Sequence, residues 1–319
     1  MEKTLPKMLR KSAQDYAEIP AQYSKNKDGE FEPITYRQMF QLSLDFAASL
    51  LEIGVQREQP IGLISDNRKE WECASMGIMA LGAVDVPRGC DATLIDLEKI
   101  LSFTESEIVI AENISQVNKI LSIKEKLPAL QRIISFDEIT QENINSAKEQ
   151  NVLLCYFWDM IKSGQKYRIE HPNVVEDELE KGCERDLATI IFTSGTTGNP
   201  KGVELIHKNF ITQLDELQER IYLNPGEKGL CCLPVWHVFQ RLCEYVILSQ
   251  GAAICYSKPV GSILLADFQK INPHIMPAVP RIYEAIYDGI NKKMRKTGGI
   301  VNALFNFFLS VAKIHSAMH

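Results

Sequence analysis

A ten-residue polar string at 193–202 holds the residue types best suited to bind a polyphosphate. It reads TSGTTGNPKG and follows the apolar run 187–192, which predicts a buried strand. Glycines let backbone N–H groups approach phosphate oxygens closely, hydroxyls donate hydrogen bonds, and Lys201 adds a positive charge. The spacing is not that of the common phosphate loop, because Gly202 follows the lysine where Ser or Thr is expected. The pattern favours a phosphate-binding loop over the alternative, a flexible polar linker.

Two later strings could take part in the same chemistry. The first, LPVWHVFQR at 233–241, places an aromatic side chain beside a histidine, whose charge can change near neutral pH. The second, MPAVPRIYE at 276–284, puts Pro280 at a helix start, where its missing N–H costs nothing. Each string has a structural alternative. The histidine can be a core residue, Arg241 can form a buried ion pair with Glu244, and the second string can be a plain helix start.

Together, the three strings resemble the AMP-forming adenylating enzymes, the family of acyl-CoA synthetases, luciferases and peptide-synthetase adenylation domains. Within that family they look most like the long-chain fatty acid–CoA ligases. The resemblance implies that the loop cradles the phosphates of ATP, that the Trp–His pair brackets the fatty-acid carboxylate, and that the third string borders the acyl tunnel. It implies catalytic roles for His237 and Lys201 and assigns no metal ligand. The implied cofactor-binding residues are Thr193, Ser194, Gly195, Thr196, Thr197, Gly198 and Lys201, and the implied substrate-binding residues are Trp236, His237, Val279, Pro280 and Arg281.

Two positions depart from the long-chain pattern L-P-L-x-H-x-F-E-R. Val235 stands where Leu is usual, which keeps an apolar side chain. Gln240 stands where Glu is usual, which removes a carboxylate and any charge role there. His207, just past the loop, has no place in these strings and is predicted to be structural. Weaker matches in the first half extend the resemblance over nearly the whole chain.

The resemblance implies ATP-dependent conversion of a long-chain fatty acid to an acyl-adenylate and then to a CoA thioester, with Mg²⁺ as cofactor. A medium-chain or aryl-CoA ligase is the alternative within the class. Family members carry further elements that residues 285–319 do not match: a Tyr-Gly-x-Thr-Glu element for adenine and Mg²⁺, a ribose-binding Asp, a hinge Arg, and a C-terminal domain with a mobile Lys.

We therefore expect residues 1–319 to form an incomplete AMP-binding N-terminal domain, truncated before the C-terminal domain. Such a chain should be inactive or severely impaired alone, because Mg²⁺ and the mobile Lys supply much of the charge stabilisation that adenylation needs. The alternative, from another class, is a non-catalytic nucleotide-binding fragment or one half of a split enzyme that acts with a separate C-terminal half.

Composition excludes some other functions. The 319 residues carry a formal net charge of −6 with a pI of about 5.6, which argues against a nucleic-acid partner. The eight cysteines are scattered without metal-ligand spacing, and the N-terminus lacks the apolar core of a signal peptide. Reduced thiols in the cytoplasm are therefore expected.

The elements that must position these strings alternate between strands and helices. A strand at 60–65, an apolar helix at 71–82 and a strand at 83–87 make a βαβ pattern, which implies a parallel sheet covered by helices. We predict an α/β fold with doubly wound, mostly parallel sheets in two lobes, about 1–180 and 181–319, the second incomplete. Further predicted strands are 107–111, 132–135, 187–192, 229–235, 252–256 and 274–279; further helices are 35–51, 94–103, 116–127, one between the loop and about residue 222, 237–249, 263–270, 281–295 and 300–317.

The C-terminal stretch carries a different signal. The basic string KKMRK at 292–296 precedes an apolar run at 300–311. A basic cluster beside an apolar helical face can bind an anionic membrane surface, so peripheral membrane contact through 292–314 is one interpretation. The other is a helix that buries this face against the fold, and it is favoured because such a face is the ordinary core pattern.

Overall fold

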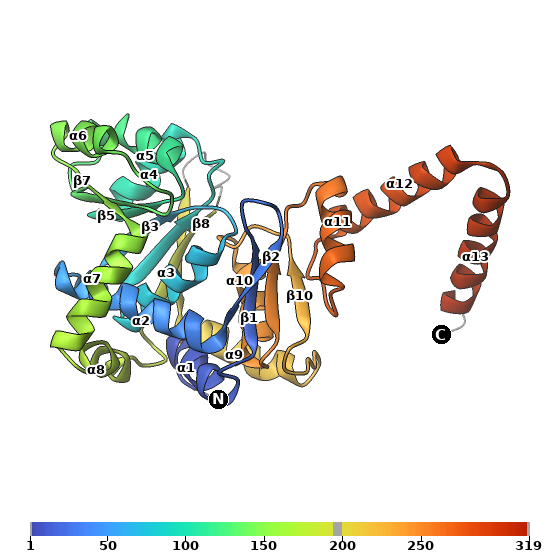
Figure 1. Cartoon of the computed structure of the whole chain (residues 1–319), viewed down its shortest axis with the longest axis horizontal. Coiled ribbons are helices and arrows are strands. Elements are labelled where there is room, and N and C mark those ends of the chain that lie inside the picture. The colour runs from blue at the N-terminus through green and yellow to red at the C-terminus, as the bar shows by residue number, and fades with distance from the viewer. Residues whose placement is uncertain (1, 194–199, 318–319) are drawn as a thin grey trace.

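The predicted βαβ unit forms the centre of the larger of two sheets. Its strands β3 (Pro60–Ile64) and β4 (Val84–Arg88) pair in parallel, with α3 (Lys69–Ala80) crossing between them. The computed structural model describes residues 2–193 and 200–317. Within these residues the strands form two sheets with helices packed against them (Figure 1), so the predicted α/β fold with mostly parallel sheets is confirmed.

The larger sheet is covered on both faces. Its strand order is β7-β6-β5-β3-β4-β8-β9, with every pair parallel except β8–β9. One face packs under α2, α3, α7 and α8, and the other packs under α4, α5 and α6. Burial on both faces explains why the strands are continuous apolar runs. The bounds are β5 (Ile108–Ala111), β6 (Arg132–Ser135), β7 (Leu153–Tyr156), β8 (Leu187–Thr193), β9 (Lys201–Ile206), α2 (Tyr36–Glu52), α4 (Leu94–Phe103), α5 (Ile114–Leu121), η1 (Lys124–Lys126), α6 (Gln141–Glu149), α7 (Phe157–Glu170) and α8 (Val174–Lys181).

The smaller sheet joins segments from both ends of the chain. Its order is β10-β11-β1-β2, and β1 pairs in parallel with β11 and antiparallel with β2. Helices α1, α9 and α10 share a core with one face, while α11 packs on the other. The bounds are α1 (Leu5–Asp15), β1 (Pro20–Lys25), β2 (Phe31–Thr35), α9 (His207–Gln218), β10 (Lys228–Cys231), α10 (Val238–Ser249), β11 (Ala253–Tyr256) and α11 (Gly261–Ile271).

This pairing corrects where the two lobes divide, because each lobe is one sheet with the helices packed on it. Strands β8 and β9 follow residue 180 in sequence but complete the larger sheet, while β1 and β2 precede it and belong to the smaller one. A boundary near residue 180 therefore does not separate the sheets. Strand pairing joins residues far apart in sequence, and a local change in polarity does not report it.

Two local predictions were also wrong. The segment after the 193–202 string was expected to enter a helix directly, but 201–206 first forms β9, antiparallel to β8, and α9 begins only at His207. The run 274–279 was predicted to be a strand, yet it makes only a single bridge, between Ile275 and Gly229. Pro277 inside the run lacks the N–H group that a longer ladder needs.

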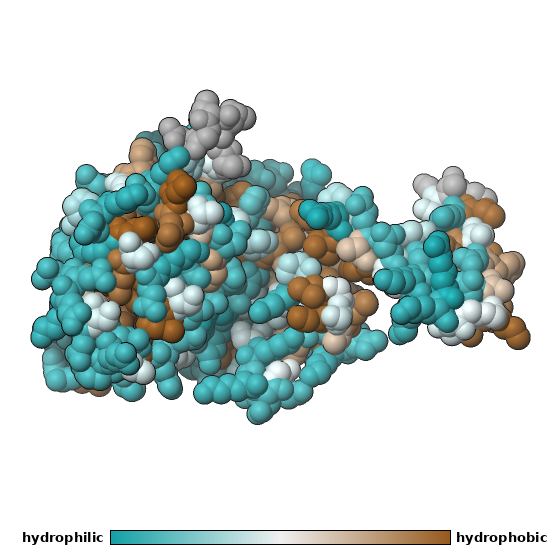
Figure 2. Space-filling model, turned by 90° about the horizontal axis from the view of Figure 1, so that it is seen from above, coloured by the Kyte–Doolittle hydropathy of each residue, from teal (hydrophilic) through white to brown (hydrophobic). Residues whose placement is uncertain are grey.

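The last two helices extend away from both sheets (Figure 1). These are α12 (Pro280–Thr297) and α13 (Gly299–Ala317), and together we call them the arm. None of the described residues of α12 is buried, and Ile300, Phe307 and Phe308 of α13 are more than half exposed. Figure 2 shows hydrophobic residues on the surface of the projecting arm. The prediction that this face packs against the fold is therefore wrong for this chain. Among the described residues, no helix has both the length and the apolar composition needed to cross a bilayer.

Candidate functional site

The 193–202 string connects the two strands of a hairpin at one edge of the larger sheet. Thr193 ends β8 and lies opposite Lys201, which begins β9, and both side chains are exposed. Gly202 lies close against the sheet beside them, because a Cβ there would lie 3.0 Å from the Ile190 side chain. The predicted phosphate-binding residues Ser194, Gly195, Thr196, Thr197 and Gly198 lie outside the described residues, so their role stays a prediction.

The segment before the Trp–His pair is tied to the larger sheet by one side chain. Asn67 follows β3; its Nδ2 donates to the carbonyl of Leu233 at 2.7 Å, and its Oδ1 accepts from the N–H of Val235 at 2.9 Å. These two bonds satisfy the backbone of a segment that has just left β10. No pattern in the sequence indicated this role for Asn67, although it follows a predicted strand end, where such side chains commonly lie.

Trp236 docks against the carboxyl end of β4. The guanidinium carbon of Arg88 lies 4.6 Å from the centroid of the Trp236 ring, within the range of a cation–π contact. Gly89 lies directly under the indole, and a Cβ at that position would come within 2.2 Å of Trp236 Nε1. The ring position is therefore fixed by the backbone and the side chain of a different lobe.

The β4 and β8 strand ends bring two of the predicted strings together. β4 and β8 are neighbouring parallel strands, paired at Asp85 and Thr189. Trp236 contacts the end of β4, and the polar string begins at the end of β8. Because both strands run the same way, their ends meet at one edge of the sheet, where open α/β sheets bind ligands.

His237 is exposed beside this edge and caps α10. Its Nδ1 accepts a hydrogen bond from the N–H of Phe239 at 3.3 Å, and its ring centroid lies 6.5 Å from that of Trp236. An accepting Nδ1 carries no proton, so in the neutral ring Nε2 holds the proton. The nitrogen left to meet a substrate is therefore Nε2, which fits the predicted position near a carboxylate.

A buried arginine locks α10 onto the larger sheet. Both terminal nitrogens of Arg241 donate to the Asp85 carboxylate, at 2.9 and 2.8 Å, and the side chains of both residues are fully buried. Thr189, Ser75 and Tyr245 accept its remaining donors. The predicted ion pair of Arg241 with Glu244 is thus corrected, because Asp85 of the other sheet is the partner.

Glu244 is held instead by neutral groups. Gln240 Nε2 donates to it at 2.8 Å and the Tyr256 hydroxyl donates at 2.9 Å. Nearby Glu72 is fully buried, and neither of its carboxylate oxygens has a hydrogen-bond partner among the described residues. Burial raises the pKa of both Glu72 and Glu244. A glutamate at position 240, as in the long-chain pattern, would add another buried carboxylate beside Glu72 and Glu244, so glutamine suits this environment.

His207 is structural, as predicted. It is buried, and its Nδ1 accepts from the N–H of Leu5 at 3.3 Å, which ties α1 to the start of α9. Burial lowers the pKa of His207 to about 4. The side chain is therefore neutral in the fold at physiological pH.

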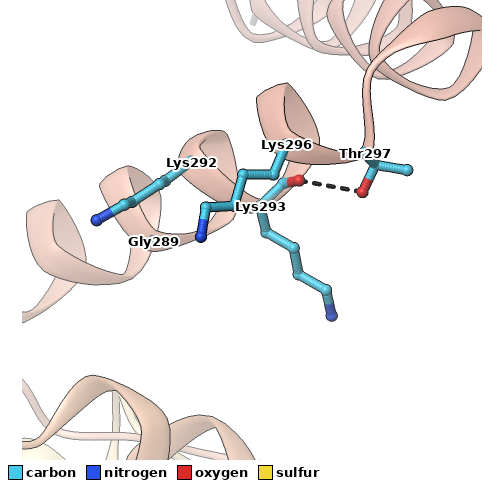
Figure 3. Close-up of a pocket in the computed structure, with 5 residues that line it drawn as sticks. All are labelled: Gly289, Lys292, Lys293, Lys296 and Thr297. Atoms are coloured by element: carbon cyan, nitrogen blue, oxygen red, sulfur yellow. Dashed lines mark hydrogen bonds between the residues drawn. The ribbon is translucent and has the colours of Figure 1, made fainter.

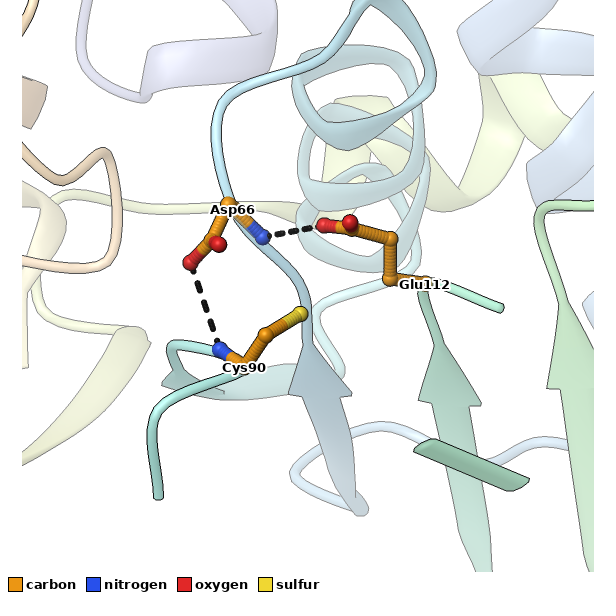
Figure 4. A group of neighbouring side chains, drawn as sticks. All are labelled: Asp66, Cys90 and Glu112. Carbon is orange, nitrogen blue, oxygen red and sulfur yellow. Dashed lines mark hydrogen bonds between the residues drawn. The ribbon is translucent and has the colours of Figure 1, made fainter. Parts of the chain in front are cut away.

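Three potential metal ligands lie at neighbouring strand ends (Figure 4). Ligand atoms of Asp66, Cys90 and Glu112 lie within 4.8 Å of one another. However, the Asp66 carboxylate accepts from the N–H of Cys90 at 3.2 Å, and the Glu112 carboxylate accepts from the N–H of Asp66 at 2.7 Å and from the Ser65 hydroxyl. Burial raises the pKa of Asp66 and of the Cys90 thiol, which disfavours the charged forms that bind metals. These hydrogen bonds give the three side chains a structural role, which is to hold together the ends of β3, β4 and β5.

The third predicted string does not join this corner. Val279 caps the exposed start of α12, Pro280 is its first residue, and Arg281 is exposed. Among the described residues, no hydrogen bond or ring contact links this segment to Trp236 or His237. Further along, a shallow hollow bounded by Gly289 and nearby lysines lies along α12 alone (Figure 3), so it lacks the opposing walls of a binding site.

Known sequences resemble this chain over most of its length. Residues 9–311 match a family described as "AMP-binding enzyme". Three proteins of Arabidopsis thaliana are similar: probable acyl-activating enzyme 16, chloroplastic (33% identical, 92% of this chain), the chloroplastic long-chain-fatty-acid–[acyl-carrier-protein] ligase AEE15 (31%, 92%), and long chain acyl-CoA synthetase 3 (30%, 88%). This chain spans 40%, 40% and 42% of their lengths, respectively.

Solved structures share the fold. The adenylation and carrier didomain of a carboxylic acid reductase from Segniliparus rugosus, in complex with AMP, superposes with a TM-score of 0.76 at 20% identity, covering 93% of this chain and 45% of that one. The N-terminal domain of FACL13 from Mycobacterium tuberculosis gives 0.72 at 23% identity, covering 89% and 65%.

Proposed function

The chain belongs to the AMP-binding enzyme family, and from that membership we propose that it is the N-terminal portion of an AMP-forming long-chain fatty acid ligase. The proposed reaction joins ATP and a fatty acid to give an acyl-adenylate and diphosphate, and then transfers the acyl group to the thiol of CoA. The observation that carries the proposal is the shared edge of β4 and β8, where the Trp236 corner meets the polar string.

The proposed roles follow from that edge. Lys201 and Thr193 stand at the two ends of the string, where they can contact phosphate oxygens on either side. His237, with Nε2 directed away from its helix cap, serves the fatty-acid carboxylate, and the Trp236 ring borders the acyl entrance. The acyl role of Val279, Pro280 and Arg281 remains part of the proposal, although these residues have no described contact with the corner.

Mg²⁺ is assigned no ligand in this chain. In the family pattern it belongs to an element that this sequence does not match, and the Asp66–Cys90–Glu112 cluster is occupied by its own hydrogen bonds. The ion would neutralise phosphate charge during adenylation. In the proposal, residues outside this chain hold it.

The thiol acceptor has a second candidate. One relative that is 31% identical is named as a ligase for an acyl carrier protein rather than for CoA. CoA and the acyl carrier protein both react with the acyl-adenylate through a thiol. The residues that bind ATP and the fatty-acid carboxylate would therefore be the same for the two acceptors. The two are separated by incubating the enzyme, ATP and palmitate with CoA or with a pantetheinylated acyl carrier protein and measuring which becomes acylated.

The first step is tested by ATP–diphosphate exchange with palmitate. We expect exchange from the longest polypeptide that the gene encodes and little or none from residues 1–319 alone. Exchange by residues 1–319 alone would refute the expectation of an impaired portion. Absence of exchange and of ATP binding in both would refute the ligase proposal and favour the non-catalytic alternative.

A substitution of Lys201 tests the loop. Lys201→Ala should slow exchange by about tenfold or more, because charge-assisted contacts to phosphate are the strong ones. Lys208→Ala is the matched control, since Lys208 lies on α9 in an ion pair with Glu184. Equal exchange rates for the two variants would contradict the assignment of Lys201.

A further inference from the structure

A cavity of about 700 Å³ opens between the two lobes beside the β1–β2 hairpin. No residue assigned above to ATP, fatty acid or CoA lines it. Its walls come from the hairpin, the turn before α3, the segment after β6, and the segment that leads from β11 into α11. Lining residues used below are Gln22, Ser24, Lys27, Glu32, Ile34, Lys69, Tyr256 and Lys258.

Gln22 supplies the first recognition group. Its side chain is fully buried on β1; its Nε2 donates to the Ser24 hydroxyl at 3.3 Å, while its Oε1 has no hydrogen-bond partner among the described residues. Gln22 and Ser24 are two positions apart on the strand, so both point to the face that lines the cavity. A buried acceptor without a partner is unfavourable. A ligand hydroxyl or N–H at this point would remove that cost.

Some of the charges around the cavity are already neutralised. Lys25 pairs with the buried carboxylate of Asp267 at 2.6 Å. Arg68 pairs with Glu70 at 2.8 Å and with Asp137 at 3.0 Å. These groups brace the walls and leave little attraction for a ligand.

The remaining wall charges are mainly positive. Lys27, Lys69 and Lys258 form no ion pair in the described part of the chain, and Lys69 lies over the Trp158 ring at 5.3 Å. The single wall carboxylate without a lysine or arginine partner there is Glu32, which accepts from Asn26 at 2.8 Å. Because Arg68 pairs with two carboxylates, its group carries one net negative charge, so the wall as a whole has a surplus of one positive charge beside a buried, unpaired acceptor.

We propose that this cavity binds a phosphate monoester that carries free hydroxyl groups. A phosphate monoester has a charge of about −1.5 to −2 at neutral pH, which the three unpaired lysines of the wall would attract. Its phosphate would lie near the exposed amines of Lys27 and Lys258, and a hydroxyl would donate to Gln22 Oε1. Ile34 and Tyr256 offer apolar surface to the carbon frame. This site goes beyond the proposed ligase function and does not depend on it.

Calorimetric titration of the whole chain with ribose 5-phosphate, ribose and inorganic phosphate tests the proposal. Ribose 5-phosphate should bind at least about tenfold more tightly than ribose or inorganic phosphate, because one site recognises both the phosphate and a sugar hydroxyl. Gln22→Leu should reduce the affinity to that of inorganic phosphate alone, and Lys258→Met should weaken it about fivefold or more. Lys148→Met, on the exposed face of α6, and Lys201→Ala, in the phosphate string, should leave it unchanged.

Two results would overturn the proposal. One is equal affinity for ribose 5-phosphate and inorganic phosphate, which would mean charge attraction without a site. The other is loss of binding in Lys201→Ala but not in Gln22→Leu, which would move the ligand to the phosphate string. If Gln22→Leu fails to fold by circular dichroism, the exposed substitution Lys258→Met carries the test against its control, Lys148→Met.

Discussion

The turn that carries Trp236 and the segment that carries Val279–Arg281 are held in place very differently. The first is fixed by Asn67, Arg88 and Gly89 from the other lobe. The second begins an exposed helix, α12, whose Tyr283 hydroxyl donates to the nearby Met276 carbonyl and whose only described apolar packing against the fold is at Ile282 and Ile286. Residues that several separate elements hold keep one geometry, whereas a lone helix fixes only its own backbone.

The preorganised geometry of this chain lies where α10 and the segment before it meet β4. The lock between Arg241 and Asp85 joins α10 to β4, and the contact of Arg88 with Trp236 joins the segment just before α10 to the end of the same strand. A buried ion pair and a cation–π contact therefore fix the position of one lobe relative to the other. The arm has neither kind of contact to the sheets in the described residues, so substitutions there should have small effects.

The largest expected effect comes from breaking the lock. Arg241→Met leaves Asp85 buried and unpaired, and we expect the free energy of unfolding to fall by about 3–5 kcal/mol. Arg281→Met, on the exposed start of α12, should change it by less than about 0.5 kcal/mol. Urea unfolding followed by circular dichroism measures both. Adding Asp85→Leu to Arg241→Met should recover much of the loss; no recovery would mean that packing rather than charge dominates.

The next effect is a dependence on pH. Burial lowers the pKa of His207 to about 4, below the unfolded value of 6.5, in an environment that contains Asp186, Asp85, Arg241 and Arg57. A group with a depressed pKa stabilises the fold above its unfolded pKa, and this stability is lost as the pH falls through 6.5 towards 4. The difference corresponds to about 3 kcal/mol.

Substitution of His207 isolates its contribution to the pH dependence of stability. In His207→Gln, whose amide oxygen can still accept from Leu5, the loss of stability between pH 6.5 and pH 4 should be smaller than in the unsubstituted chain. His171→Gln, at an exposed position after α7, should keep the original slope. Parallel slopes for all three proteins would show that His207 does not titrate in this range.

The smallest expected change in stability compares the Trp236 turn directly with α12, because one glycine is replaced by alanine in each. Gly89→Ala places a methyl group 2.2 Å from Trp236 Nε1, and we expect a loss of about 1–3 kcal/mol as the indole is displaced. Gly289→Ala, inside α12, meets no atom within 4 Å and should stabilise by about 0.5–1 kcal/mol. Thermal unfolding measures the change in stability of each variant, and Trp fluorescence reports displacement of the indole. Equal changes in melting temperature for the two variants would contradict the distinction between the two regions.

Much of the local structure could be predicted from the sequence. Thr35 caps α2 as expected, with Gln38 completing the capping box, and Gly54 has the positive φ of 89° that follows a helix end. Such features depend on residues a few positions apart, whose preferences act within one helix or turn. The apolar strands and most helices were found for the same reason.

The local elements and the family could be predicted from residues close together in the chain, because the polar string and the Trp–His pair are short motifs. Three features could be found only in the folded molecule: which strands share a sheet, the pairing of Arg241 with Asp85, and the positioning of the Trp236 turn by Gly89 and Asn67. These contacts join residues more than 140 positions apart. Their partners are chosen by burial and geometry in three dimensions, and no spacing along the chain encodes that choice.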